Sequence, residues 1–258
     1  MYWGIFTFVT LLGLCIGSFL NVVIHRLPRR ESIVLPGSRC PRCLKPLSPL
    51  DNIPILSYIM LHGKCRTCCA AISMRYPLVE ALTALLFALC YVRYGFTLAF
   101  FLSCILCALM VACAFIDWEH QLVMDSLIVA GFIVALPVNG FFSALCGWRE
   151  MLLGIVCGAG PLLLIALIGR LISKRPVMGG GDIKLMGMAG AFLGWKMALL
   201  SFVFASVAGG LVLAALLALG KVKRNQEVPF VPMLAFGVTV ALLVGQPLLD
   251  WYLALFML

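Results

Sequence analysis

The chain has 258 residues, of which 64% are hydrophobic and only 11% carry charge. A soluble domain usually has about a quarter of its residues charged, so this chain lacks the polar surface of a water-soluble globular protein. The net charge of +9 does not indicate nucleic-acid binding, because nine of the nineteen basic residues lie in one polar stretch, residues 26–75, and most others form short patches between apolar runs.

Apolar runs near the ~20 residues that a membrane-spanning helix needs alternate with short polar segments. The first is expected at residues 4–24. A signal peptide is the alternative interpretation, disfavoured because no small-x-small cleavage site follows a basic leader. Later segments are expected at 77–93, 97–116, 122–142, 151–171 and 233–252, while 185–220 should form a short arm and a long helix around a turn at 194–196. The sequence predicts an all-α polytopic membrane protein with about eight transmembrane helices.

Basic residues in loops mark the cytoplasmic side of a membrane protein. Eight crossings place the loops at 25–76, 173–184 and 221–229, together with the polar segment 117–121, on one side of the membrane. Each of the first three loops is basic. We therefore expect these loops in the cytoplasm and the N-terminus outside.

Five of the twelve cysteines lie in the polar insert, as Cys40-Pro-Arg-Cys43 and Cys65-Arg-Thr-Cys68-Cys69. Two Cys-x-x-Cys pairs separated by 21 residues fit a zinc site of four thiolates. Such a site is structural, because four cysteines leave no open position on the metal. A pair of disulfides is the alternative, which a reducing cytoplasm disfavours. Cys69 is a spare thiol that is also able to replace Cys68 as a ligand.

Three acidic residues lie where predicted spans meet the cytoplasmic side, namely Asp117, Asp125 and Asp182. Ionisable groups at membrane depth cost about 2.5–3.5 kcal/mol on insertion scales and usually mark function. The three glycines at 179–181 permit positive φ and close backbone approach, so we expect a helix break that opens a water-filled notch. Two carboxylates in such a notch suit peptide hydrolysis by an acid pair. Simple helix capping and an ion or proton path remain open alternatives.

Ordered motifs follow one another along nearly the whole chain. They are Gly17–Pro28 (GSFLNVVIHRLP), the two cysteine pairs, Asn52–Tyr58 (NIPILSY), Arg75–Glu80 (RYPLVE), Ile116–Leu127 and Gly179–Leu185 (GGGDIKL). In these motifs the chain resembles the type IV prepilin peptidase family.

The resemblance implies a multi-pass enzyme of the bacterial inner membrane whose active site faces the cytoplasm. Such an enzyme is an aspartyl endopeptidase that cuts the short basic leader from prepilins and pseudopilins after a glycine. Its catalytic pair corresponds to Asp117 and Asp182. The residues expected to support that pair are Asp125, Gly179, Gly181 and Lys184.

The resemblance also implies a second reaction, in which S-adenosylmethionine methylates the new N-terminal amine. Residues 25–76 match the cysteine-rich region associated with methylating members, and contacts to the methyl donor are expected at Glu80 and in this insert. In this division, residues 1–24 form the first transmembrane helix and residues 77–258 the peptidase domain. The expected partners are prepilins or pseudopilins and membrane lipid, with no nucleic acid. A homo-oligomer is left open.

The chain departs from the family pattern at Met124, at Cys69 and at Val231, where proline, glycine and glycine are usual. None of these changes removes a catalytic carboxylate. The alternative function is a membrane transporter or scaffold that carries a zinc knuckle. A transporter needs polar groups along several spans, whereas the mid-span residues here are nearly all apolar. The peptidase is therefore the expected function.

Overall fold

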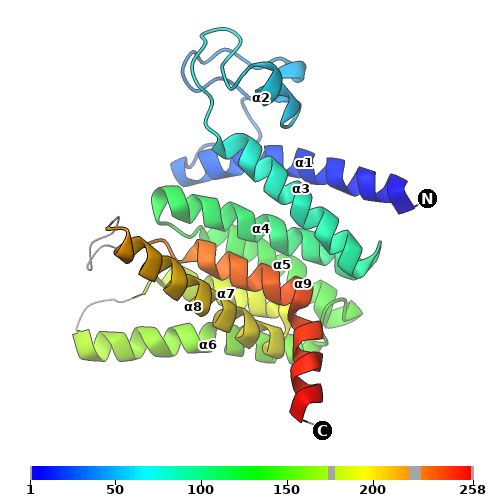
Figure 1. Ribbon diagram of the computed structural model, residues 1–258, viewed down its shortest axis with the longest axis vertical. Coiled ribbons are helices and arrows are strands. Elements are labelled where there is room, and N and C mark those ends of the chain that lie inside the picture. The colour runs from blue at the N-terminus through cyan, green and yellow to red at the C-terminus, as the bar shows by residue number, and fades with distance from the viewer. Residues whose placement is uncertain (1, 174–177, 221–227, 257–258) are drawn as a thin grey trace. The chain divides into compact units, whose positions relative to one another are not determined.

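The computed structural model describes residues 2–173, 178–220 and 228–256 (Figure 1). The predicted basic patches at 174–175 and 221–224 lie outside the described residues. The chain forms two compact units, with the boundary between Phe96 and Thr97. In the described residues all regular elements are helices, which confirms the all-α prediction.

The first unit consists of two long helices and the insert between them. Its elements are α1 (Tyr2–Arg26), η1 (Leu27–Arg29), η2 (Pro49–Asn52), α2 (Leu56–Met60) and α3 (Arg75–Tyr94). The insert leaves α1 after Arg26 and enters α3 at Arg75, close to the predicted limits 25–76. Residues 77–94, which the sequence analysis grouped with the peptidase domain, pack against α1 within this unit.

Two glycines of α1 bring its backbone against α3. A Cβ at Gly13 would lie 2.7 Å from the Cα of Ala84, and one at Gly17 would lie 2.7 Å from the Cα of Glu80. The pair forms a Gly-x-x-x-Gly motif, whose small residues let membrane helices approach closely. One turn further on, the Asn21 side-chain amide donates a hydrogen bond to the carbonyl of Tyr76 at 3.0 Å.

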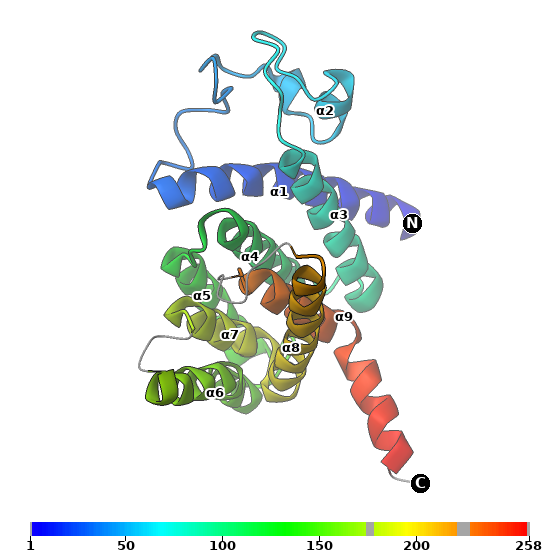
Figure 2. The same cartoon turned by 60° about the vertical axis from the view of Figure 1, so that its left-hand side comes forward.

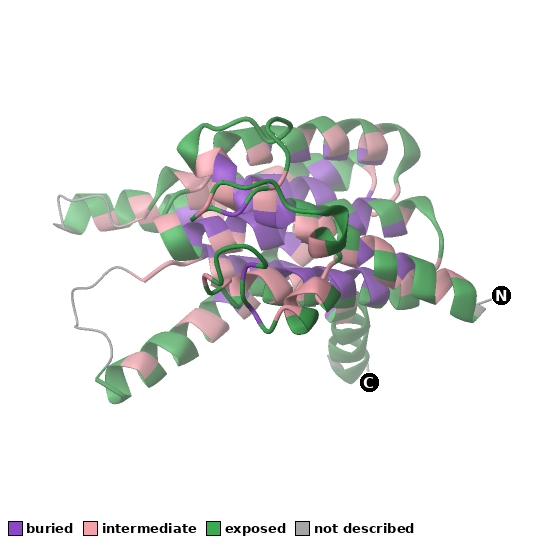
Figure 3. Ribbon diagram, turned by 90° about the horizontal axis from the view of Figure 1, so that it is seen from above, coloured by how far each residue is buried: buried purple, intermediate pink, exposed green. Residues whose placement is uncertain are grey.

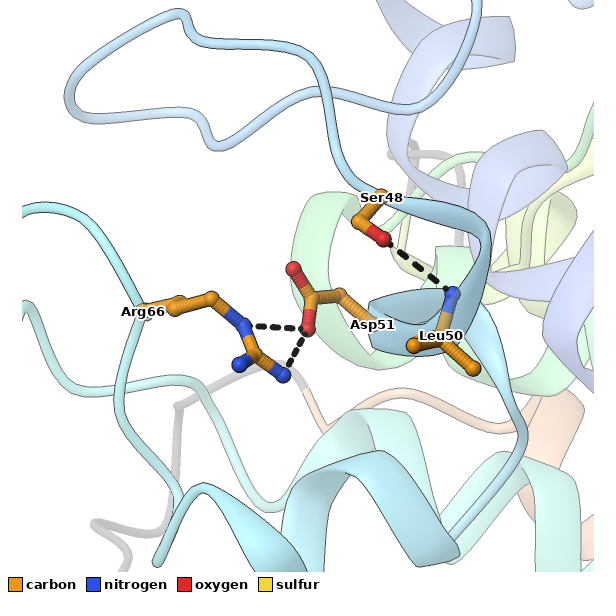
Figure 4. A network of polar contacts seen from close by, with 4 residues as sticks. All are labelled: Ser48, Leu50, Asp51 and Arg66. Carbon is orange, nitrogen blue, oxygen red and sulfur yellow. Dashed lines mark hydrogen bonds and ion pairs between the residues drawn. The ribbon is translucent and has the colours of Figure 1, made fainter.

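The insert has little regular structure and is held together largely by polar contacts. The Arg66 guanidinium contacts the Asp51 carboxylate at 2.7 Å, and the Ser48 hydroxyl accepts from the Leu50 amide as the N-cap of η2 (Figure 4). The Asp51 side chain is only 7% exposed, so this ion pair is partly shielded from water. The pair joins η2 to the second cysteine pair, which lies 15 residues later in the chain.

The second unit is a bundle of six helices. They are α4 (Leu98–His120), α5 (Asp125–Phe142), α6 (Trp148–Ser173), α7 (Gly180–Leu193), α8 (Trp195–Ala218) and α9 (Val231–Phe256). The short helix α7 contacts the other five and lies between α5 and α6 (Figure 2). Every residue from Leu185 to Leu193 is buried, and buried positions gather where the helices face one another (Figure 3).

The C-terminal part of helix α7 is enclosed, and its last carbonyls are satisfied by a side chain of a neighbouring helix. The Asn139 side-chain amide donates to the carbonyls of Ala191 and Phe192, at 2.9 and 3.1 Å. The chain then turns at Gly194, with a φ of +76°, into α8. These two helices are the short arm and the long helix predicted for residues 185–220.

Seven helices in the described part of the chain are long and apolar enough to cross a membrane. They are α1, α3, α4, α5, α6, α8 and α9. Helix α7, with 14 residues, is shorter than the ~20 that a crossing helix needs. The prediction of an all-α polytopic membrane protein is confirmed.

The structure corrects the expected end of the third span. The sequence analysis ended it at residue 116 and placed 117–121 in a polar segment, whereas α4 continues to His120. No glycine or proline stands in this stretch to stop the helix, which ends where Gln121 adopts a left-handed conformation with a φ of +51°. Asp117 therefore lies on the last turns of a helix and not in a loop.

The contact between α6 and α7 generates the first prediction. A Cβ at Gly190 would overlap the carbonyl oxygen of Gly154. We expect Gly190→Ala to destabilise the bundle by about 1–3 kcal/mol, because two backbones must move apart. The thermal midpoint of the purified protein should fall by roughly 2–10 °C.

Gly160→Ala on α6 is the matched control, because a Cβ there meets nothing within 4 Å. Alanine also favours a helix over glycine, by up to about 1 kcal/mol. Equal midpoints for the two variants would contradict the close packing of α6 on α7.

Candidate functional site

Asp117 is a buried carboxylate at the end of α4. Its side chain is surrounded by the bundle, and the residue is 6% exposed. The carboxylate accepts a hydrogen bond from the backbone N–H of Val231, at 3.1 Å. Val231 is the first residue of α9, so this acid lies at the positive end of a helix dipole.

Asp182 lies in the first turn of α7, directly after the glycine run. Gly179 precedes the helix with a φ of −70°, so the expected left-handed backbone is not used there. Close approach is used at Gly181, where a Cβ would lie 2.6 Å from the Cβ of Val123. This contact fixes the start of α7, and with it Asp182, against the segment that joins α4 to α5.

The two acids Asp117 and Asp182 influence each other electrostatically. Burial, followed by the charge of Asp117, raises the pKa of the Asp182 carboxyl from its usual 3.8 to about 6. Two carboxylates that lie close together in a partly dry site cannot both ionise cheaply. The arrangement therefore suits a pair that holds one proton between them.

Asp125 and Lys184 form an exposed ion pair beside this site. The Lys184 ammonium lies 2.8 Å from the Asp125 carboxylate, and the pair connects the first turn of α5 to the first turns of α7. Exposed pairs of this kind contribute about 0–1 kcal/mol. Asp125 is thus separated in role from Asp117, which is buried, and from Asp182, which is partly buried.

Helix capping was the alternative explanation for aspartates at the ends of the spans. Asp125 and Asp182 do not occupy the N-cap positions of their helices. The N-cap residues are Met124 for α5 and Gly179 for α7, and neither cap has a side-chain hydrogen bond. Asp125 and Asp182 each lie one or more residues inside the helix. Their carboxylates are therefore free of the capping role that the sequence left open.

The four cysteines predicted as zinc ligands lie together in the insert. The sulfur atoms of Cys40, Cys43, Cys65 and Cys68 all lie within 4.8 Å of one another. The Cys40 and Cys68 sulfurs are 3.8 Å apart. Sulfur atoms bound at ~2.3 Å to a tetrahedral ion lie about 3.8 Å from each other, so the cluster has the dimensions of a zinc site.

The backbone of each cysteine pair favours the thiolate form that binds metal. Backbone N–H groups of Cys68 and Thr67 lower the pKa of the Cys65 thiol to about 6. Those of Cys43 and Arg42 lower the pKa of Cys40 in the same way. All twelve cysteines are free thiols, so the disulfide alternative is not realised.

Each of the two cysteine pairs forms a backbone turn of the same type. The amide of Leu44 donates to the Cys40 carbonyl, and that of Cys69 donates to the Cys65 carbonyl, both at 2.9 Å. Leu44 and Cys69 have φ values of +58° and +56°. Glycine adopts this conformation without strain, which explains why glycine is usual where this chain has Cys69.

Glu80 is buried in the first unit, with 7% of the residue exposed. Its carboxylate accepts a hydrogen bond from the backbone N–H of Ile55 at 2.7 Å and pairs with the Ser18 hydroxyl. It therefore connects α3 both to α1 and to the insert.

Sequence reasoning did not anticipate the contact between Asp117 and the Val231 amide. The signal lay at Val231, which the sequence analysis noted only as a departure from the family pattern. The structure places this residue at the buried acid, to which the first N–H of α9 donates.

Comparisons with known proteins agree with this arrangement. A family model described as "Type IV leader peptidase family" matches residues 104–214, and one described as "Bacterial Peptidase A24 N-terminal domain" matches residues 11–94. The two matches fall on either side of the boundary between the structural units.

Several curated relatives bear the name "Prepilin leader peptidase/N-methyltransferase". The protein from Pseudomonas aeruginosa is 37% identical, over 94% of this chain and 91% of its own. That from Bacillus subtilis is 35% identical, over 93% and 95%. The protein from Myxococcus xanthus is 42% identical over 85% of this chain, which spans 66% of that relative.

No solved structure was found to match the chain. The family models nevertheless cover both units, and the relatives align with most of the sequence. This chain belongs to the type IV leader peptidase family.

Proposed function

We propose that this chain is an aspartyl endopeptidase of the bacterial inner membrane that cuts the basic leader from prepilins or pseudopilins after a glycine. The active site faces the cytoplasm, and the new N-terminal amine is then methylated. The observation that carries the peptidase proposal is the shared environment of Asp117 and Asp182, in which the charge of one raises the pKa of the other. Family membership supports the same chemistry.

The two acids have different surroundings, which supports different roles in cleavage. The Val231 N–H and the positive end of α9 stabilise negative charge on Asp117, so this acid is the general base that activates water. Asp182 holds the shared proton and donates it to the carbonyl oxygen or to the leaving amine. The observed pH profile would report values of the pair and not of either residue.

The supporting residues act on the position of α7. Gly181 allows α7 to approach Val123, and the Lys184–Asp125 ion pair holds the same end of α7 to α5. At Gly179 a Cβ would make only an ordinary contact with the Asp182 carboxylate oxygen, at 3.9 Å, so Gly181 and the ion pair carry this steric role. These contacts restrict where the Asp182 carboxylate can lie relative to Asp117.

The cysteine cluster suits one structural zinc ion held by Cys40, Cys43, Cys65 and Cys68. S-adenosylmethionine would supply the methyl group of the second reaction. In that reaction a nitrogen–carbon bond forms and a carbon–sulfur bond breaks. The electron pair remains on sulfur, which becomes a thioether, and the amine loses one proton. Prepilins are the proposed substrates of both reactions. A transporter is not favoured, because Asp117 is the one acidic or basic residue among the buried side chains described in the second unit.

The acid pair is tested by cleavage of a co-expressed prepilin. Asp117→Asn and Asp182→Asn should each reduce cleavage by about 1,000-fold or more, because each removes one acid–base group. Asp250→Asn, which changes an exposed aspartate of α9, is the control and should cleave normally. The mass of the product N-terminus, about 14 Da above that of simple hydrolysis, reports methylation. Normal cleavage by either folded active-site variant would exclude the pair.

The raised pKa of Asp182 predicts how stability depends on pH. Between about pH 4 and 6 the unfolded chain releases the Asp182 proton while the folded chain keeps it. The stability that depends on the neutral acid is therefore present below pH 4 and lost as pH rises through 6. The thermal midpoint of the wild type, relative to Asp182→Asn, should fall from pH 4 to pH 7. The thermal midpoint of Asp250→Asn should change with pH as that of the wild type does. If the midpoint of Asp182→Asn also changed in parallel with the wild type, the raised pKa of Asp182 would be contradicted.

The zinc proposal predicts one zinc ion per chain in the purified protein. Cys68→Ser should lose the metal, because three thiolates bind zinc more weakly than four. Cys69→Ser should retain it, because this neighbouring thiol lies outside the cluster. Metal content is measured by mass spectrometry. Zinc retained by Cys68→Ser and lost by Cys69→Ser would reassign the fourth ligand, and a wild type without zinc would refute the site.

A further inference from the structure

The first unit contains a cavity of about 300 Å³ between α1 and the insert. One wall is the face of α1 that carries Cys15, Ser18, Phe19, Val22 and Arg26. The opposite walls are formed by two segments of the insert, residues 33–38 and residues 52–54. The volume lies at the lower end of small-molecule sites, which suits a nucleoside-sized ligand and is too small for a pilin helix.

A buried arginine at the end of α1 is hydrogen-bonded to the insert segment that carries lining residues 33–38. Arg26 is 8% exposed, and its guanidinium donates to the carbonyls of Ser32 and Gly37 at 3.0 and 3.1 Å. Burying a charge is costly unless the group is well hydrogen-bonded. The guanidinium has five N–H donors, so these two contacts leave others for an anionic group in the cavity.

The insert segment 33–38 continues directly into the zinc cluster. The carbonyl of Ser38, a lining residue, accepts from the Leu47 amide at 2.8 Å. Arg39 then pairs with Pro46 in a short bridge, and Cys40 is the first metal ligand. The metal cluster therefore fixes one end of the cavity wall.

Glu80 holds the second wall through a strained turn. Ile55 has a φ of +59° and a ψ of −49°, and the Leu56 amide donates to the Pro54 carbonyl at 2.6 Å, as in a γ-turn. Such a conformation is rare for a β-branched residue and persists only where surrounding contacts hold it. The Glu80 carboxylate binds the Ile55 amide and Ser18, which places Pro54 and Ser18 on the cavity.

The lining combines the groups that a zwitterionic nucleoside requires. Arg26 offers a cation, and Asn52 and Ser38 offer neutral hydrogen-bonding groups. Phe19 offers an aromatic face, and Ile33, Val34 and Pro36 of the insert add apolar surface. An adenine ring requires such flat apolar surfaces, and an amino-acid carboxylate requires the cation.

We propose that this cavity is the binding site for the methyl donor S-adenosylmethionine, with Arg26 as the partner of its carboxylate, Phe19 as the surface for its adenine, and Glu80 as a positioning residue that holds the cavity walls. The proposal rests on the methylation assigned under the proposed function. It refines the expectation for Glu80, which supports the lining residues and does not itself line the cavity.

The test measures donor binding by calorimetry on the full-length protein in detergent, with S-adenosylmethionine and its demethylated product as probes. Val22→Trp places a large side chain in the cavity and should weaken binding by ~10-fold or more. Phe19→Ala, which removes bulk and cannot overfill the site, should also weaken it. Leu11→Trp on the same helix is the control and should bind as the wild type does, since Leu11 is exposed and does not line the cavity.

Glu80 is tested with two variants that separate positioning from direct contact. Glu80→Ala removes the acceptor for the Ile55 amide and should weaken donor binding, with a higher KM for the donor and a similar kcat at saturation. Glu80→Gln keeps an acceptor oxygen and should restore most of the affinity. Equal losses for Gln and Ala would show that the carboxylate itself meets the donor and would overturn the positioning role.

The outcomes separate this proposal from the methylation on which it rests. A wild type that cleaves prepilin, binds no donor and adds no methyl group would remove the second reaction altogether. A wild type that binds the donor, while Val22→Trp and Phe19→Ala bind it equally well with zinc content unchanged, would place the donor elsewhere and leave methylation standing.

Discussion

Helix backbones come into direct contact at glycines in both units, and the positions of the polar side chains follow from these contacts. In the first unit, Gly13 and Gly17 let α1 approach α3 so closely that Glu80 reaches Ser18. In the second unit, the carbonyls and Cα atoms of α6 and α7 meet at Gly154. Within a membrane, apolar side chains gain little by leaving lipid, so packing of this kind is what holds helices together. The functional groups are thus placed by backbones and not by flexible side chains.

The buried charges of the two units serve different purposes. Arg26 and Glu80 use their hydrogen bonds on backbone groups of the insert, so their charges organise structure. Asp117 and Asp182 have fewer partners, and the burial of Asp182 shifts its proton affinity. A carboxylate whose hydrogen bonds are incomplete remains available to water and substrate. This difference supports a reaction centre in the second unit and a binding site in the first.

Much of the fold and the candidate site could be predicted from local pattern. Apolar runs located the long helices, and the Cys-x-x-Cys spacing identified the metal cluster. The continuation of α4 through Asp117 was missed, because a polar stretch between apolar runs of a membrane protein predicts a loop. Only the group that contacts Asp117 explains why the helix continues there. That partner, the amide of Val231, is 114 residues away in the chain. The cavity beside Arg26 was missed for the same reason, since two of its walls come from irregular segments of the insert, whose sequence has no hydrophobic period.

The packing of the insert along α1 has a consequence for the surrounding bilayer. Insert segments lie beside α1 from Cys15 onwards, and the last turns of that helix carry Asn21 and Arg26. The stretch of α1 that precedes the insert segments, residues 3–14, is ~18 Å long at 1.5 Å per residue, against a hydrocarbon core of ~30 Å. A membrane adapts to so short a segment by thinning around it. A thinner bilayer at α1 brings the cytoplasmic water, and any charged cofactor dissolved in it, closer to a helix that would otherwise be covered by lipid.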